Sequence, residues 1–433
     1  MGAREQASVV VTGIGLVTAI GNGVGSVWPA AIAGKSGTRL VDFAWTKERA
    51  FKCQTGAPVS PPAPQEYGCN AEELKYIDPT GQFALAACHM ALRDAGLTLA
   101  RVEDKREIYR LNEVDERRIG TVIGTAVGGM PTIEWSHQHW LSGRPITGTL
   151  RFSLPMLIPN AIPGQLAIKF GLRGENKSIT TACAAGTMAL GDAFRLIRSG
   201  ALDAVVAGGA ECLLSDNDGF GMIGFELLRT LSSRNHDPAG ASRPFDAERD
   251  GFVMGEGAGL LVLERRDHAV ARGARIYCEV AGYAANSDAY SMVQLDPSGE
   301  QITDVLSQAL ADADLGLGDI GYVNAHGTAT RVNDAVEAKA MRRLWGRQID
   351  DVLVNSTKAM IGHTIGAAGG IEAAITALSL YHEQVHPCVN LETPDPECDL
   401  NLPRRATQLT GRAAMSNSYG FGGHNASIVL KPQ

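Results

Sequence analysis

The strongest constraint on the fold is a regular alternation of short apolar, β-branched segments with longer segments of helical periodicity. The short segments predict strands, and the long segments predict helices because their apolar residues recur at i, i+3 and i+4. Strands that alternate with helices are typical of α/β proteins with mainly parallel sheets covered by helices. The predicted strands are 9–12, 121–123, 204–207, 260–263, 322–324, 352–354 and 427–430, and the predicted helices are 82–94, 186–198, 302–312, 334–344 and 370–382.

The chain also divides into two parts that are loosely alike. Its 433 residues are enough for about two or three domain-sized units. Each part contains a strand end with reactive side chains, followed by a long helix, and the most polar connection between the parts is 265–275. We therefore predict two halves, 1–268 and 269–433, although periodicity alone does not establish a repeat.

The composition favours a globular cytoplasmic protein with no membrane or nucleic-acid partner. The net charge is −8, and no basic face is evident. No signal peptide precedes the first strand, and no apolar run reaches the ~18 residues of a membrane span. The eight cysteines are scattered without a Cys-x-x-Cys pair, which is typical of free thiols in a reducing compartment. The densely charged segment 101–118 is interpreted as a solvated surface insertion.

Cys183 stands at the start of a predicted helix, directly after the β-branched run 179–181. Unpaired N–H groups and the positive end of the helix dipole at such a position favour the thiolate, the reactive form of cysteine. The small residues 184–186 leave room for a substrate close to the backbone. Cys183 is therefore a candidate nucleophile, and a buried structural cysteine is the alternative.

Two histidines, His326 and His363, lie in loops of small residues beside predicted strands and helices. Cys–His pairs commonly activate thiols. A cysteine with two neutral histidines suits thioester condensation: the thiolate accepts an acyl group, and a malonyl-type thioester loses carbon dioxide. The imidazole N–H groups can then stabilise the resulting enolate as an oxyanion hole does.

Further residues surround this set in the sequence. Lys358 and Glu372 bracket His363, and a buried pair of this kind either orders the histidines or is only structural. Thr328 and Thr330 are suitable hydrogen-bond partners for an amide-rich pantetheine arm. The glycine-rich segment 417–425 predicts either a loop whose N–H groups approach a ligand or a tight turn before the last strand.

Three functions from other classes remain as alternatives. A Cys–His acyl hydrolase would need only one histidine and an orienting Asn or Asp. Gly13 and Gly15 suggest a dinucleotide site, but no third glycine falls at the required offset. His382 and His386 lie four residues apart, yet no further ligand cluster is near them in the sequence, so we predict no metal site.

Several motifs in order along nearly the whole chain resemble the β-ketoacyl-acyl carrier protein synthases of the elongating Cys-His-His type, in the thiolase-like superfamily. They are Val11-Thr-Gly-Ile-Gly, Thr181-Ala-Cys-Ala-Ala-Gly, the segment 242–257, His326-Gly-Thr-Ala-Thr, Lys358-Ala-Met-Ile-Gly-His and Gly420-Phe-Gly-Gly-His-Asn. The resemblance implies a five-layer αβαβα fold made of two pseudo-symmetric βαβαβ halves. It also implies an acyltransferase that extends an acyl thioester by two carbons through decarboxylative Claisen condensation with a malonyl carrier thioester.

The resemblance also implies residue roles. Cys183 accepts the acyl group, His326 and His363 form the decarboxylation and condensation site, and Lys358 and Glu372 support them. The remaining assignments are an oxyanion hole of the Cys183 and Phe421 N–H groups, a gate formed by the Phe421 ring, an acyl-pocket wall at Val127, and contacts of Arg229 and Lys75 with the carrier protein. No resident cofactor is expected, because phosphopantetheine arrives on the acyl carrier protein.

The pathway and the partner subunit stay open. A fatty-acid enzyme would be a homodimer, whereas the ketosynthase subunit of a type II polyketide system would pair with a homologous chain-length factor. The motifs favour the first possibility, and the charged segment 101–118 favours the second.

Overall fold

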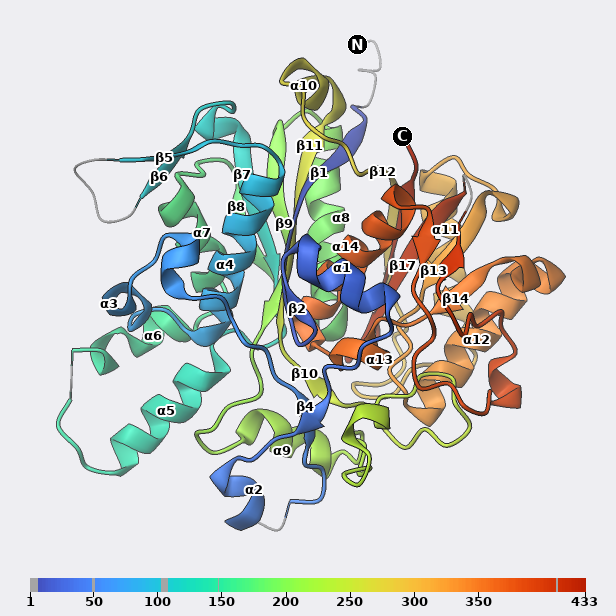
Figure 1. Cartoon of the computed structure of the whole chain (residues 1–433), viewed down its shortest axis with the longest axis horizontal. Coiled ribbons are helices and arrows are strands. Elements are labelled where there is room, and N and C mark those ends of the chain that lie inside the picture. Colours follow the sequence, from blue (N-terminus) through green and yellow to red (C-terminus); the bar gives the residue numbers. More distant parts are fainter. Residues whose placement is uncertain (1–6, 49–50, 103–107, 147, 410–411) are drawn as a thin grey trace.

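The computed structural model describes residues 7–48, 51–102, 108–146, 148–409 and 412–433 (Figure 1). Each predicted strand and helix overlaps an element of the same type. Of the predicted surface insertion, residues 103–107 lie outside the described part; its flanks form the short hairpin β5 (Leu99–Arg101) and β6 (Tyr109–Leu111). Among the described residues, no helix combines the length and apolar character needed to cross a bilayer.

The first half of the chain forms one end of a large sheet, with strand order β8-β7-β9-β11-β1. β8, β7 and β9 are parallel to one another, and β11 is antiparallel to both of its neighbours. The strands are β1 (Val9–Thr18), β7 (Ile119–Gly124), β8 (Asn176–Ile179), β9 (Ala204–Glu211) and β11 (Gly257–Arg265).

The second half repeats this arrangement, with strand order β14-β13-β17-β18-β12. Numbered within each half, both orders read third, second, fourth, fifth and first strand, with the same parallel and antiparallel pairings. The strands are β12 (Cys278–Ser287), β13 (Ile320–Asn324), β14 (Leu353–Asn355), β17 (Ala413–Gly420) and β18 (His424–Lys431). The duplication that periodicity left open is therefore visible in the topology.

The sheet is mixed, which corrects the expectation of mainly parallel strands. In each half the last two strands in the chain, β9 with β11 and β17 with β18, run antiparallel. A tight turn between β17 and β18 replaces the helical crossover that a parallel connection needs. β1 and β12 also pair, and this pairing joins the two halves into one sheet.

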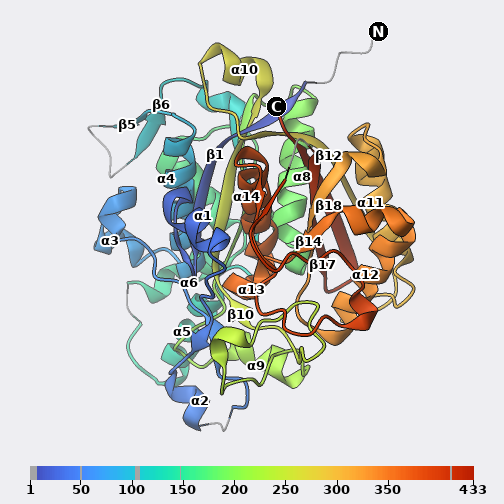
Figure 2. The ribbon, with the colours of Figure 1, turned by 45° about the vertical axis from the view of Figure 1, so that its right-hand side comes forward.

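The helices form three layers, and the two halves of the sheet lie between these layers. α8 (Ala185–Arg198) and α14 (Ala368–Tyr381) pack against strands of both halves and form the central layer (Figures 1 and 2). α4 (Pro79–Asp94) and α7 (Ala161–Phe170) cover the first half, whereas α11 (Glu300–Asp312) and α12 (Arg331–Trp345) lie outside the second. The predicted αβαβα layers are thus confirmed.

The central helix α14 is buried along almost its whole length, from Ala368 to Leu380. A helix that is apolar on all sides is stable only in such a position. Its contact with β11 depends on glycine, because a Cβ at Gly370 would lie 2.2 Å from the carbonyl oxygen of Gly259. The bottom of the candidate site therefore rests on a closely packed, rigid layer.

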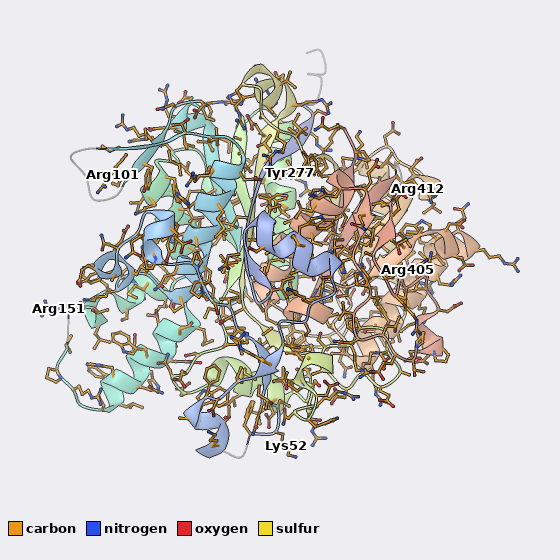
Figure 3. All side chains as sticks on the ribbon, viewed as in Figure 1. Lys52, Arg101, Arg151, Tyr277, Arg405 and Arg412 are labelled. Carbon is orange, nitrogen blue, oxygen red and sulfur yellow. The ribbon has the colours of Figure 1, made fainter. Side chains whose placement is uncertain are left out.

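The remaining elements are shorter or peripheral. The predicted boundary at 268/269 falls inside α10 (Arg266–Ala271), the connection between β11 and β12. The labelled basic side chains lie on different sides, with Arg101 and Arg151 on the first half and Arg405 and Arg412 on the second (Figure 3). The other helices are α1 (Val24–Ile32), α2 (Ala44–Glu48), α3 (Ala71–Leu74), α5 (Met130–Leu141), α6 (Ser153–Leu157), α9 (Phe220–Leu227) and α13 (Lys358–Ile361), and the other strands are β2 (Gly21–Asn22), β3 (Arg39–Leu40), β4 (Thr55–Ala57), β10 (Met254–Gly255), β15 (Gln384–Val385) and β16 (Thr407–Gln408).

Candidate active site

A cavity of about 400 Å³ opens where several strands end. Cys183 follows β8, His326 follows β13, and Phe421 follows β17, while His363 reaches the cavity after β14 and α13. The carboxyl ends of parallel strands are where open α/β sheets commonly bind ligands. The four side chains, far apart in the sequence, all line this one cavity.

Cys183 lies in the short helix η4 (Ala182–Ala184), which leads into α8. Ala182 adopts a left-handed backbone conformation with φ 49°, a rare geometry for a residue with a side chain. The Cys183 Sγ atom is 3.1 Å from Nε2 of His363. The nucleophile candidate is thus held on a strained turn, with one histidine in direct contact.

Burial of the thiol acts against the thiolate, in the direction opposite to the effect of the helix start. Burial raises the pKa of Cys183 to about 12, and the Lys358 charge and the Phe421 N–H group oppose this increase only in part. Burial prevails because the low-dielectric interior penalises an unpaired anion more than the helix start stabilises it. Reaction therefore requires groups that stabilise the thiolate as it forms.

Hydrogen bonds fix the tautomers of both histidines. Nδ1 of His363 accepts the N–H group of Ile365 at 3.3 Å, and Nδ1 of His326 accepts from the Lys358 ammonium group at 3.3 Å. Burial and the Lys358 charge lower the pKa of both rings well below the usual value. Both rings are therefore neutral, with hydrogen on Nε2.

Cys183, His326 and His363 form a compact group. The Cys183 sulfur and one ring nitrogen of each histidine lie within 4.8 Å of one another. The ring centroids of the histidines are 5.3 Å apart and the ring planes are nearly perpendicular. Two N–H donors and a thiol at these distances can serve one substrate carbonyl group and its attacking carbon.

Lys358 and Glu372 form the buried ion pair that the sequence suggested. Their side chains are 1% and 0% exposed, and the ammonium group also contacts His326. Burial raises the pKa of Glu372 to about 7, against the lowering effect of the Lys358 charge. Removal of one partner would leave the other as an uncompensated buried charge.

The glycine-rich segment is the turn between β17 and β18, and both sequence interpretations apply to it. The turn places the Phe421 N–H group against the Cys183 sulfur. Gly420 permits this approach, because a Cβ there would lie 2.8 Å from the Thr181 carbonyl oxygen. The Phe421 ring packs against Phe225, with centroids 6.0 Å apart, and both line the cavity.

The other predicted residues are divided between the cavity and more distant positions. Thr328 and Thr330 line the cavity, with their hydroxyl oxygens 3.0 Å apart, and Arg229 is exposed at its mouth. Val127 is absent from the lining and packs into the apolar cluster that contains Cys183. Lys75 lies elsewhere, exposed beside α3 and paired with Glu72 at 2.6 Å.

Two buried carboxylates and one arginine escaped the sequence analysis. Glu337 on α12 accepts the N–H groups of His326 and Gly327, each at 2.8 Å, and so holds the histidine loop. Glu211 at the end of β9 is equally buried. For Glu337 the available signal was a carboxylate within the predicted helix 334–344. Arg331 lines the mouth together with Arg229.

His382 and His386, four residues apart in the sequence, have separate environments. His382 stacks on Trp28, whereas the ring nitrogens of His386 contact the Thr357 hydroxyl group at 3.2 Å and the Pro387 carbonyl oxygen at 2.9 Å. Within the described residues, Cys183, His326 and His363 are the one cluster with metal-ligand spacing. A histidine nitrogen that carries hydrogen does not bind a metal.

Comparisons with known proteins cover almost the entire chain. Residues 6–269 match the beta-ketoacyl synthase N-terminal domain, and residues 277–392 match the beta-ketoacyl synthase C-terminal domain. The chain is 40% identical over 428 residues to a 3-oxoacyl-[acyl-carrier-protein] synthase 2 from Synechocystis sp., covering 99% of this chain and 98% of the relative. A synthase of the same name from Staphylococcus aureus is 39% identical over 432 residues, covering 99% of each chain.

Solved structures with the same architecture come from polyketide systems as well. The ishigamide ketosynthase/chain length factor superposes with a TM-score of 0.86 at 31% identity, covering 99% of this chain and all of that one. A type II PKS acyl-carrier protein in complex with its ketosynthase gives 0.85 at 32%, with the same coverage. The chain therefore belongs to the beta-ketoacyl synthase family, acyltransferases that elongate acyl chains in fatty acid or polyketide biosynthesis.

Proposed function

We propose that this chain condenses an acyl thioester with a malonyl thioester, both carried by acyl carrier protein, and that Cys183, His326 and His363 perform the chemistry. The observation that carries this proposal is the 3.1 Å contact between Cys183 and His363 in a cavity shared with His326. Phosphopantetheine arrives with each carrier, so no resident cofactor enters the reaction. Thr328 and Thr330 would bind the amide groups of that arm.

The first step transfers the acyl group to Cys183. The sulfur attacks the thioester carbonyl carbon, a new carbon–sulfur bond forms, and the bond to the carrier sulfur breaks. The thiol proton leaves on the released carrier thiol. The His363 Nε2–H group, the Phe421 N–H group and the Lys358 charge stabilise the sulfur as it becomes negative.

The second step joins the two carbon chains. The malonyl thioester oxygen accepts hydrogen bonds from Nε2 of His326 and His363, carbon dioxide leaves, and an enolate remains. Its carbon attacks the acyl group on Cys183 while the N–H groups of Cys183 and Phe421 stabilise the oxyanion. The carbon–sulfur bond then breaks, Cys183 regains a proton from solvent, and a β-ketoacyl carrier two carbons longer is released.

Charge at the cavity mouth supports an acidic carrier as the substrate vehicle. Arg229 and Arg331 are exposed there. A phosphopantetheine phosphate and acidic carrier side chains would meet these two guanidinium groups first. Lys75, apart from the cavity and paired with Glu72, is the weaker candidate for this contact. In this proposal the half 1–268 supplies the nucleophile, and the half 269–433 supplies the two histidines.

A homologous partner subunit is the second part of the proposal. β8 is the edge strand of the sheet, and unpaired edges of soluble proteins are usually covered. Large exposed apolar side chains gather on α5, α6 and α7; α5 contacts α6, α6 contacts α7, and α7 contacts β8. These side chains include Trp140, Leu141, Leu154 and Ile168. A second copy of the chain would cover this face, and a chain-length factor is the alternative that the solved ketosynthase/chain length factor favours. All eight cysteines lie in the described part of the chain, are buried and form no disulfide, which fits a cytoplasmic setting.

Intact-mass spectrometry with acyl carriers of graded length, followed by malonyl carrier, tests the proposal. An acyl adduct on Cys183 that is discharged as a product two carbons longer is the expected result. An adduct that requires a co-purified homologous subunit identifies the heterodimer. Absence of an adduct under both conditions would contradict the assignment of Cys183.

A further inference from the structure

Glu211 is a fully buried carboxylate that joins the two halves beneath the cavity and has no part in the steps above. It is the last residue of β9. Its contacts are all N–H or O–H groups of uncharged partners: Oε1 accepts the Thr125 hydroxyl at 3.1 Å and the Val127 N–H at 3.4 Å, and Oε2 accepts the Ala126 N–H at 2.5 Å and the Gly366 N–H at 3.2 Å. The carboxylate therefore connects the turn after β7 with the segment that follows His363.

The site is built around this carboxylate. A Cβ at Gly366 would lie 2.4 Å from Oε2 of Glu211, so only glycine leaves room for the contact. Burial raises the pKa of Glu211 to about 7, even though its N–H donors act in the opposite direction. Burial of a carboxylate without a cation partner costs free energy, and the four hydrogen bonds to Glu211 offset part of that cost.

The backbone that Glu211 holds is strained and contacts His363. Ile365 has φ 47°, a conformation that is unfavourable for a β-branched residue. The N–H group of Ile365 donates to Nδ1 of His363, and the next N–H group, that of Gly366, donates to Glu211. The carboxylate and the histidine thus bind adjacent amides of one strained segment.

We propose that Glu211 is a positioning residue of the condensation: it holds the Ile365–Gly366 backbone so that His363 directs its Nε2–H group at Cys183. The inference rests on the proposed function, because the step that it affects is the one assigned to His363. The other contacts of Glu211 fix the turn 125–127, which carries Val127 behind the nucleophile.

The test is Glu211→Gln, with Glu256→Gln as the matched control. Glu256 is also buried, accepts the Val59 N–H group at 3.0 Å, and is absent from the cavity lining. We expect kcat for malonyl-carrier decarboxylation to fall about 100-fold in E211Q, because a small misplacement of a reacting group has an effect of this size. KM should change less than about twofold, because the substitution leaves Arg229 and Arg331 at the mouth in place. Binding to these two residues stabilises the ground state and the transition state equally. Glu211→Asp, which keeps both oxygens, should restore part of kcat.

Three results would overturn the inference: wild-type kcat in E211Q, an equal loss in E256Q, or a loss that appears only in KM. If E211Q does not fold, Thr125→Val removes one of the four donors and keeps the carboxylate. This variant should lower kcat about twofold to tenfold and also lower Tm slightly, because the Thr125 hydroxyl group accepts the Gly128 N–H group at 3.1 Å as well. Wild-type kcat would contradict the inference. The wild-type enzyme in the same assay separates the two proposals. If the wild type releases no carbon dioxide, the proposed function and this inference are both refuted. If the wild type and E211Q are equally active, only the role of Glu211 is refuted.

Discussion

The two strand-to-helix junctions of the duplicated fold have the same backbone geometry and different chemistry. β8 leads through η4 into α8, and β14 leads through α13 and then η8 (Ile365–Ala367) into α14. The first residue of each short helix is left-handed, with φ 49° at Ala182 and φ 47° at Ile365. The residue that follows is Cys183 in the first half and Gly366 in the second.

The difference shows how a symmetric frame produces one asymmetric site. In the first junction, Cys183 lines a cavity that a substrate can enter. In the second junction, the Gly366 N–H group is already bound by the Glu211 carboxylate. The neighbouring turns differ in the same way, because the second residue after β7 is Ala126 and the second residue after β13 is His326. In the proposed mechanism, one half supplies the nucleophile, and the other supplies the N–H donors.

The largest effect is expected when the nucleophile is removed from the first junction. Cys183→Ala should lower condensation by about 10⁴-fold or more, because covalent acyl transfer has no substitute group. Malonyl decarboxylation should persist, since both histidines remain. Elongation of acyl carriers, followed by mass spectrometry, measures this. Unimpaired elongation would show that Cys183 is not the nucleophile, so the two junctions would not differ in chemistry as proposed.

His363→Ala tests the donor side of the comparison. Loss of one preorganised N–H donor should lower carbon dioxide release from malonyl carrier by about 10²–10³-fold. Acylation of Cys183 should fall less, because the Phe421 N–H group and the Lys358 charge still stabilise the sulfur. Release of labelled carbon dioxide gives the first rate and intact mass the second. Wild-type release of carbon dioxide would remove His363 from the mechanism.

Glu337→Gln tests whether burial raises the pKa of the carboxylate that holds the His326 loop. Burial raises the pKa of Glu337 from 4.5 to about 7. A raised pKa means that the folded state binds the proton more tightly, so this contribution to stability is present below pH 4.5 and is lost as pH rises through 7. The stability of the wild type relative to E337Q should therefore decrease from pH 5 to pH 8. Urea unfolding at both pH values measures this, and an equal difference at each pH would contradict it.

Val127→Phe should have the smallest effect on rate. Val127 packs in the apolar cluster with Cys183, so a larger ring there shortens the space available to a bound acyl chain. We expect shorter products, with kcat for short acyl carriers within about threefold of wild type. Chromatography of the released chains gives the distribution. An unchanged distribution of product lengths would show that Val127, in the turn after β7, does not line the acyl pocket.

Many strands and helices of the fold could be predicted from local sequence pattern. The β-branched runs and helical periodicities gave the right type for β1, β7, β9, β11, β13, β14 and β18 and for α4, α8, α11, α12 and α14. The edge strand β8 and the strands β12 and β17 were missed, because their apolar residues do not alternate clearly with polar ones. The antiparallel pairings also escaped prediction, since they depend on partners distant in the chain.

The sequence by itself determined the alternation of strands and helices, the cysteine at a helix start and the histidines in small-residue loops. Only the tertiary structure decided that burial raises the pKa of Cys183, that both histidines present Nε2–H, and that Glu211 and Glu337 bind loops of the site. The reason is physical. Periodicity and turn chemistry act over a few neighbouring residues, whereas desolvation, tautomer choice and the pKa of a buried carboxylate depend on groups brought together from both halves.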